Sequence, residues 1–149
     1  MLETRIKTAL ALLIPVILFI AIGGVPLILL TLVVATLASN EFFALLPSLT
    51  SERRLQMVVL SLTMPLGYLV YGWPGFGGAI ILGVMLLLVL ELVHVEKVAH
   101  EDISLDRLGG VSLGFLYTGV LGAALVIVAT TRPSSAIVWL LACVIAADT

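Results

Sequence analysis

LQMVVLSLTMPLGYLVYGWPGFGGAIILGVMLLLVLELVHV, residues 55–95, consists of two apolar runs separated by the short segment Gly72-Trp73-Pro74-Gly75. Each run approaches the length of about 20 mostly apolar residues that a helix needs to cross a bilayer. Gly and Pro between two such runs favour a turn. The stretch therefore predicts two consecutive membrane helices, over residues 55–71 and 76–95, that run in opposite directions.

The rest of the chain has the same character. Of its 149 residues, 62% are hydrophobic and 11% are charged, whereas a soluble domain carries about 25% charged residues. Such a chain cannot cover its own surface with polar groups, so lipid must be part of its surroundings. The net charge of −2 gives no support to nucleic-acid binding. The single cysteine, Cys143, lies in an apolar run and cannot form a disulfide within the chain.

Other apolar stretches extend this pattern along the whole sequence. Six stretches qualify as membrane spans, some only with their flanks: residues 6–22, 26–46, 55–71, 76–95, 108–130 and 135–147. Arg5 and Lys7 precede the apolar run over residues 8–22, as in a signal peptide, but no small-residue cleavage site separates this run from the second span. We expect an all-α polytopic membrane protein with about six transmembrane helices that form a single domain over residues 1–149.

Basic residues between these spans predict the orientation. Lys and Arg accumulate on the cytoplasmic side of membrane proteins. With the N-terminus in the cytoplasm, only Arg132 falls outside, and six basic residues fall inside: Arg5, Lys7, Arg53, Arg54, Lys97 and Arg107. Tyr68, Tyr71 and Trp73 then gather at an outer turn, as interfacial aromatics do. We therefore expect a multi-pass protein of the cell inner membrane, with its N-terminus in the cytoplasm.

Three ionisable residues near the cytoplasmic ends of the predicted spans are candidate functional groups. They are Glu41 in the second span and Glu91 and His94 in the fourth, and ionisable groups at such depth are costly. For Glu41, a functional role and a carboxylate that reaches to the headgroups have equal support. Glu91-x-x-His94 places both side chains on one helical face, as in di-iron bundles. Because no second such pair exists, a polar pair at the membrane boundary is the favoured interpretation, and the metal ligands remain unknown.

Further acidic residues lie on the predicted cytoplasmic side. Asp102 and Asp106 are four residues apart in a mixed-charge loop, for which a solvated segment is favoured over a cation site. Asp148 emerges at the end of the sixth span and is a candidate on the nucleotide or metal side. One carboxylate cannot bind a hard cation alone, so composition favours a polar cap on the last helix over such a site. A membrane helix that brings a carboxylate to the water boundary usually presents it to another group, and no such group follows Asp148 in the sequence. We therefore expect the chain to be the N-terminal part of a longer membrane protein.

Glycines in two spans suggest close helix packing. Gly110-x-x-x-Gly114, with Gly119 and Gly122, has the spacing at which helices approach closely in lipid. Homodimerisation is one interpretation, and packing against the chain's own helices is favoured because a bundle offers many partners. The glycines at 75, 77, 78 and 83 lack the Lys and Ser/Thr of a phosphate loop, so a turn and packing surface is favoured.

Four motifs together resemble one enzyme family. They are the opening MLETRIKTALALLIP (residues 1–15), Asn40-Glu41-Phe42-Phe43-x-x-Leu46, Leu116-Tyr117-Thr118-Gly119, and the ending WLLACVIAADT (residues 139–149). In order and spacing they resemble bacterial phosphatidate cytidylyltransferases, also called CDP-diacylglycerol synthases. Glu41 matches a recurrent position of that family, and Asp148 matches the start of its Asp-Thr-x-Ala-Tyr-x-x-Gly motif. Family members continue beyond that motif for about as long again, so no catalytic residue is assignable here.

The resemblance implies a reaction and its partners. The family makes CDP-diacylglycerol and pyrophosphate from CTP and phosphatidate in phospholipid biosynthesis, with a divalent cation, Mg²⁺ in our expectation. We expect the 149-residue chain alone to be inactive, because it lacks the family's C-terminal signature. Two alternatives stay open: a CTP-using lipid or polyprenol kinase-like enzyme, and a non-catalytic membrane scaffold or transporter subunit.

Overall fold

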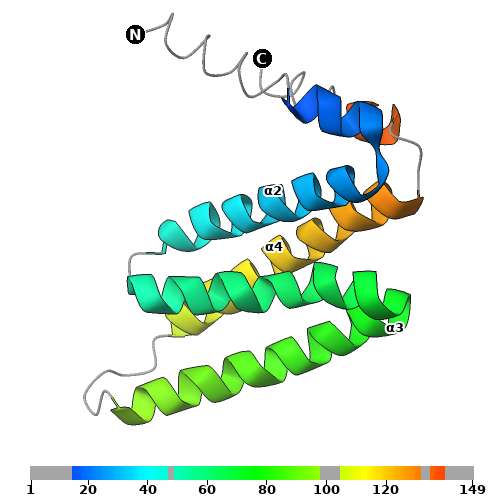
Figure 1. The fold of residues 1–149 in the computed structure, drawn as a ribbon. Coiled ribbons are helices and arrows are strands. Elements are labelled where there is room, and N and C mark those ends of the chain that lie inside the picture. Colours follow the sequence, from blue (N-terminus) through cyan, green and yellow to red (C-terminus); the bar gives the residue numbers. More distant parts are fainter. Residues whose placement is uncertain (1–14, 47–48, 98–104, 132–134, 140–149) are drawn as a thin grey trace, which may run out of the picture.

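A computed structural model describes residues 15–46, 49–97, 105–131 and 135–139 of the chain. Within these residues every regular element is helical, so the predicted all-α class is confirmed. The long helices are α2 (Gly24–Ala44), α3 (Ser51–Lys97) and α4 (Leu105–Thr131), and they pack into one bundle (Figure 1). Two shorter helical pieces, residues 15–22 and 135–139, pack against each other beside this bundle.

The number of membrane helices differs from the prediction. Three helices of the described part are long and apolar enough to cross a membrane, fewer than the six spans expected. One reason is that α3 contains both the span predicted over residues 55–71 and the span over 76–95. The other is that the first and sixth predicted spans lie mostly outside the described residues, which show helix at 15–22 and 135–139 only.

Helix α3 is a hairpin of two antiparallel arms rather than one straight rod (Figure 1). The chain reverses at Gly72, whose backbone angles are φ 65° and ψ −144°. A side chain would be strained at such a positive φ, so glycine is required there. Pro65 lies within the first arm, and the non-helical backbone occurs at Gly72 instead of at this proline.

Just beyond this reversal the two arms touch through their backbones. A Cβ added at Gly67 in the first arm would lie 2.7 Å from the carbonyl oxygen of Gly75 in the second arm. Around the turn, the ring of Trp73 lies 5.7 Å from that of Tyr68 and 6.1 Å from that of Phe76. Tyr71 and Trp73 are both exposed, as aromatic residues at a membrane–water interface are.

Replacing Gly72 by alanine should destabilise the hairpin, because a Cβ is unfavourable at positive φ. We expect the free energy of unfolding to fall by about 1–2 kcal/mol. Gly77→Ala in the second arm is the control, since a Cβ there meets no atom within 4 Å. Reversible denaturation in detergent, followed by circular dichroism, measures both; equal stabilities of the two variants would contradict the role of Gly72.

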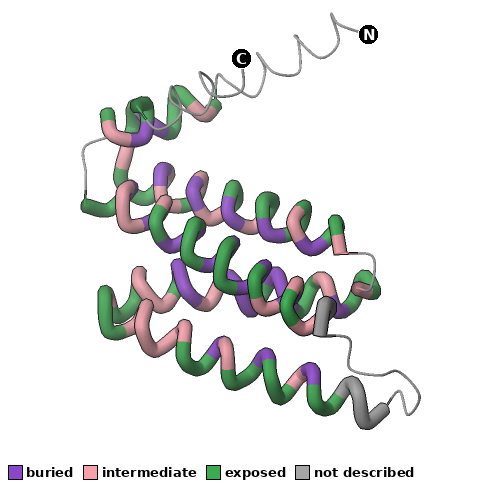
Figure 2. Tube along the Cα trace, turned by 180° about the vertical axis from the view of Figure 1, so that it is seen from behind, coloured by how far each residue is buried: buried purple, intermediate pink, exposed green. Residues whose placement is uncertain are grey.

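Helix α4 packs against both α2 and α3 and carries much of the shared core. Its buried residues recur at helical spacing along one face, as the burial pattern in Figure 2 shows: Val111, Phe115, Thr118, Ala123, Val126 and Ala129. The outer faces of the helices expose many large apolar side chains, such as Leu29, Leu82 and Leu113. This inverted distribution indicates association with a membrane, where lipid covers those faces.

The glycines of α4 contact the chain's own helices. Added Cβ atoms at these positions would fall within 2.6–3.1 Å of atoms in α2, in the segment that follows it, or in α3; the pairs are Gly110 with Leu46, Gly114 with Phe43, Gly119 with Met64 and Gly122 with Ala35. These contacts agree with packing within the bundle, the favoured interpretation. Homodimerisation stays a prediction.

Buried hydroxyl groups of the bundle bond within their own helices. Ser39 donates to the carbonyl of Ala35 at 2.8 Å, and Ser61 donates to that of Met57 at 2.7 Å. Such bonds satisfy a polar group in an apolar interior without linking two helices. In the described part, apolar packing therefore makes most of the contacts between helices. The exception is a side-chain ion pair, which is described below.

Candidate functional site

Glu41, Glu91 and the backbone of His94 lie at one end of the bundle, called here the polar end. It comprises the last turn of α2, the start of α3, the end of α3 and the start of α4 (Figure 1). The hairpin of α3 creates this arrangement, because reversal at Gly72 returns the second arm to the level at which the first began. Contacts of Gly110 with Leu46 and of Gly114 with Phe43 join α4 to α2 at the same end.

A buried ion pair joins the two arms of α3 at the polar end. The guanidinium of Arg53 donates from Nη1 to Oε1 of Glu91 and from Nη2 to the backbone carbonyl of Leu90 at 2.9 Å. Both charged side chains are only 10% exposed. Because charged groups away from water are costly unless paired and hydrogen-bonded, the pair fixes the arms in one register.

Glu91 was predicted from the sequence as a polar group at the membrane boundary, but its partner was missed. Arg53 was counted only as a basic loop residue that indicates orientation. Their positions in the sequence indicate the pairing, since Arg53 and Glu91 each lie 19 residues from Gly72. In an antiparallel hairpin that turns at Gly72, residues at equal distances from the turn lie side by side.

His94 lies one helical turn beyond Glu91 in α3, and its side chain is outside what the structure describes. Within the described residues, no group of three or more His, Cys, Asp or Glu side chains is placed to bind a metal ion. Glu91 itself bonds to Arg53. The described part of the chain therefore gives no support to a di-iron-like site.

Glu41 is exposed in the last turn of α2. The neighbouring Phe43 is fully buried and Phe42 packs partly against the core. The backbone is therefore anchored by aromatic side chains while the carboxylate points out of the bundle. Exposure at this position fits both interpretations made from the sequence, a functional carboxylate and one that reaches to the headgroups.

Two of the motifs that carried the family resemblance meet in space. The ring of Phe42 lies 5.8 Å from that of Tyr117, although the residues are 75 positions apart in the sequence. Gly114 accommodates both phenylalanines, because a Cβ there would lie 2.6 Å from Phe43 and 2.7 Å from Phe42. The motif at the end of α2 and the motif in α4 thus form one packed unit beside Glu41.

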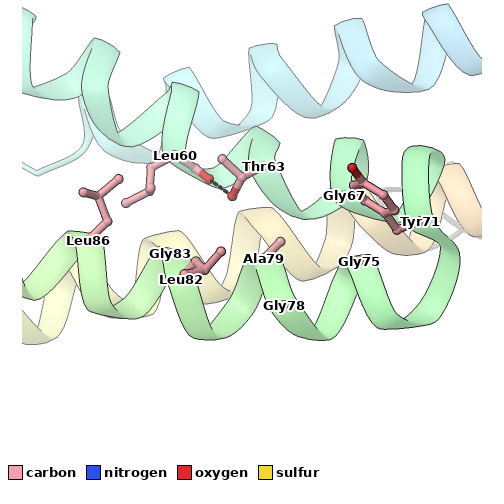
Figure 3. A pocket seen from close by; sticks show the side chains of 10 residues that line it. All are labelled: Leu60, Thr63, Gly67, Tyr71, Gly75, Gly78, Ala79, Leu82, Gly83 and Leu86. Atoms are coloured by element: carbon pink, nitrogen blue, oxygen red, sulfur yellow. Dashed lines mark hydrogen bonds between the residues drawn. The ribbon is translucent and has the colours of Figure 1, made fainter.

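An apolar groove runs between the two arms of α3, and Figure 3 shows residues that line it. It consists of two adjoining cavities of about 350 and 370 Å³ that share Leu60, Thr63 and Leu86. One cavity extends towards the Gly72 turn, and the other extends to Leu55 and Gln56, close to the polar end. We call this feature the α3 groove.

The remaining acidic candidates cannot be placed. Asp102 and Asp148 lie outside the described residues, as does the side chain of Asp106. Within the described residues, the polar end therefore combines one buried ion pair and the exposed carboxylates of Glu41 and Glu52 with the mouth of an apolar groove.

Comparison with known proteins identifies the family of the chain. The model of the cytidylyltransferase family matches residues 3–149, almost the whole chain. No curated protein and no solved structure matches the chain. The family match confirms the resemblance found in the four motifs and supports a CTP-dependent transferase activity. The chain belongs to the cytidylyltransferase family.

Proposed function

We propose that this chain is the N-terminal membrane portion of a phosphatidate cytidylyltransferase. The enzyme would use CTP and phosphatidate to make CDP-diacylglycerol and pyrophosphate. The observation that carries the proposal is the match of the cytidylyltransferase family to residues 3–149. The apolar helices support it further, because a diacyl lipid substrate stays in the bilayer while CTP arrives from water.

The proposed reaction forms one bond and breaks one bond. A phosphate oxygen of phosphatidate attacks the α-phosphorus of CTP, and the bond from that phosphorus to the bridging oxygen breaks. The β- and γ-phosphates leave together as pyrophosphate. The reactants are both anionic, so catalysis needs groups that offset this charge.

A divalent cation, Mg²⁺ in our proposal, would supply part of this charge. The described residues do not form a site for it, because Glu91 bonds to Arg53 and no cluster of metal ligands is present among them. We therefore propose that its ligands come from residues outside the described part, with Asp148 as the candidate in this sequence. No step of the reaction is assigned to a described acidic residue.

We also propose that the polar end faces the cytoplasm in the cell inner membrane. Arg53, Arg54 and Lys97 lie at this end of α3, and basic residues accumulate on the cytoplasmic side. The proposal places Glu41 and the mouth of the α3 groove where CTP is available. It also makes the aromatic residues around the Gly72 turn face the opposite interface.

The transferred group can be identified with CTP labelled at single phosphorus atoms. Membranes that contain the native polypeptide are incubated with phosphatidate and with CTP carrying ³²P at the α or the γ position. We expect α-label in the lipid product and γ-label in released pyrophosphate. Label from the γ position in lipid would indicate a lipid kinase instead. If neither the α-labelled nor the γ-labelled CTP transfers label to lipid, the proposal is contradicted. The purified 149-residue chain alone should give no product.

A further inference from the structure

The α3 groove is an apolar channel with different ends. Towards the Gly72 turn it is bounded by the contact of Gly67 with Gly75 and by Tyr71. At the other end it is lined by Gln56 and Leu90, next to the bonds from Arg53 to Glu91 and to the Leu90 carbonyl. One end is thus closed by backbone contact, and the other opens beside polar side chains.

Small residues keep the groove open. Gly78 lines it, and a Cβ added there would meet no atom within 4 Å. Gly67, Gly75 and Gly83 also line it, but Cβ atoms on those residues would collide with the other arm or with Phe115. The hydroxyl of Thr63 donates to the carbonyl of Leu60 at 2.6 Å, so its donor hydrogen is already used. The groove therefore offers mainly apolar contacts and few hydrogen-bonding groups.

The dimensions fit a hydrocarbon chain. From Gln56 to Tyr71 the first arm rises about 22 Å, which exceeds the roughly 15 Å depth of one leaflet of the hydrocarbon core. The two adjoining cavities, of about 350 and 370 Å³, lie along this length. An acyl chain is the slender apolar occupant that the surrounding membrane supplies.

Charge at the open end indicates the headgroup. Arg53 and Arg54 lie in the first turn of α3, and Arg54 is only partly buried. Among the described residues the ion pair found is that of Arg53 with Glu91, which leaves the charge of Arg54 available to an anion. A phosphate group on a lipid would meet the guanidinium group of Arg54 at the end of α3 where its acyl chain enters the groove.

We propose that the α3 groove binds one acyl chain of an anionic phospholipid, with the lipid phosphate at the Arg53–Arg54 end. The inference rests on the proposed function, because it gives the lipid substrate a binding site in this part of the enzyme. The reaction alone does not require that the lipid binds between the two arms of α3. Lipid capture by α3 would hold the headgroup at the polar end, beside Glu41 and the packed motifs of α2 and α4.

Photo-crosslinking tests the site without any need for turnover. The full chain is reconstituted in phosphatidylcholine vesicles that contain phosphatidate with a diazirine on one acyl chain, and labelled peptides are identified by mass spectrometry. We expect label on both arms of α3 within residues 55–90. Label confined to other helices would overturn the proposal.

Gly78→Leu provides the decisive variant, because Gly78 lines the groove and a Cβ added there meets no atom within 4 Å. If the leucine displaces about two methylene groups of the lipid, labelling of α3 should fall about tenfold. Gly77→Leu is the matched control, because Gly77 is adjacent, also has open space at its Cβ, and does not line either cavity. It should keep wild-type labelling. Gly78→Ala, a smaller change, should cause a smaller loss and guards against misfolding of the leucine variant.

The headgroup is tested with a phosphatidylcholine probe that carries the same diazirine chain. It should label α3 less than the phosphatidate probe does, and Arg54→Gln should remove the difference. Equal labelling by both probes in the wild type would overturn the anionic part of the proposal.

If Gly78→Leu changes the fraction of dimers and leaves labelling unchanged, the groove holds a second copy, and the proposal fails. Label on α3, together with no transfer of α-³²P in membranes that contain the native polypeptide, would keep the groove and reject the proposed function.

Discussion

Glu91→Ala is expected to lower the free energy of unfolding by about 3–5 kcal/mol, because it leaves the charge of Arg53 buried without its partner. Both side chains are only 10% exposed, so water cannot replace the lost carboxylate without opening the hairpin. The bond from Arg53 to the Leu90 carbonyl offsets only part of the loss. Reversible unfolding in detergent, followed by circular dichroism, measures the effect.

A variant that lacks both charges separates the ion pair from other effects of the substitution. Arg53→Leu combined with Glu91→Leu removes both charges, and similar replacements of buried ion pairs are often neutral or stabilising. The double variant should therefore be markedly more stable than Glu91→Ala. If Glu91→Ala stays within about 0.5 kcal/mol of the wild type, a range typical of surface substitutions, the pair does not hold the arms together.

Gly67→Val is expected to disrupt the closed end of the hairpin. Its Cβ would lie 2.7 Å from the carbonyl oxygen of Gly75 and 3.1 Å from the Cβ of Ala79. A backbone carbonyl cannot rotate away as a flexible side chain can, so the arms must separate. Overpacking of this kind costs about 1–3 kcal/mol or more, and we expect the upper part of that range.

Gly77→Val is the control for that substitution. It makes the same chemical change in the second arm of α3, at a position with no atom within 4 Å of the added Cβ. Its stability should stay close to that of the wild type. Chemical unfolding of the two variants under one set of conditions compares them, and a loss for Gly77→Val as large as that for Gly67→Val would show that backbone contact is not the cause.

The helical class and the placement of the helices followed from composition and length. Spans predicted over residues 26–46 and 108–130 correspond to α2 and α4, and the turn predicted at Gly72-Trp73-Pro74-Gly75 contains the reversal of α3. Apolar length decides such elements locally. The structure has fewer membrane helices than the six predicted spans, in part because it describes only part of the stretches over residues 6–22 and 135–147.

The candidate site was harder to predict because its contacts join distant parts of the chain. Glu91 was identified from its charge in an apolar helix, a local property, but Arg53 became its partner through the register of the hairpin. The contact of Phe42 with Tyr117 likewise depends on how α2 packs against α4. The α3 groove has no sequence signature, since it follows from which glycines face the other arm and which face open space.

The single-residue reversal at Gly72 has a consequence for how the protein enters a membrane. The tip of the hairpin, Gly72-Trp73-Pro74-Gly75, carries no charged side chain, so in the proposed orientation only an uncharged turn would be translocated to the far interface. Both charged partners, Arg53 and Glu91, stay on the side from which the hairpin started. The two arms are thus suited to leave the translocon together as one helical hairpin, with no charged loop pulled across the bilayer.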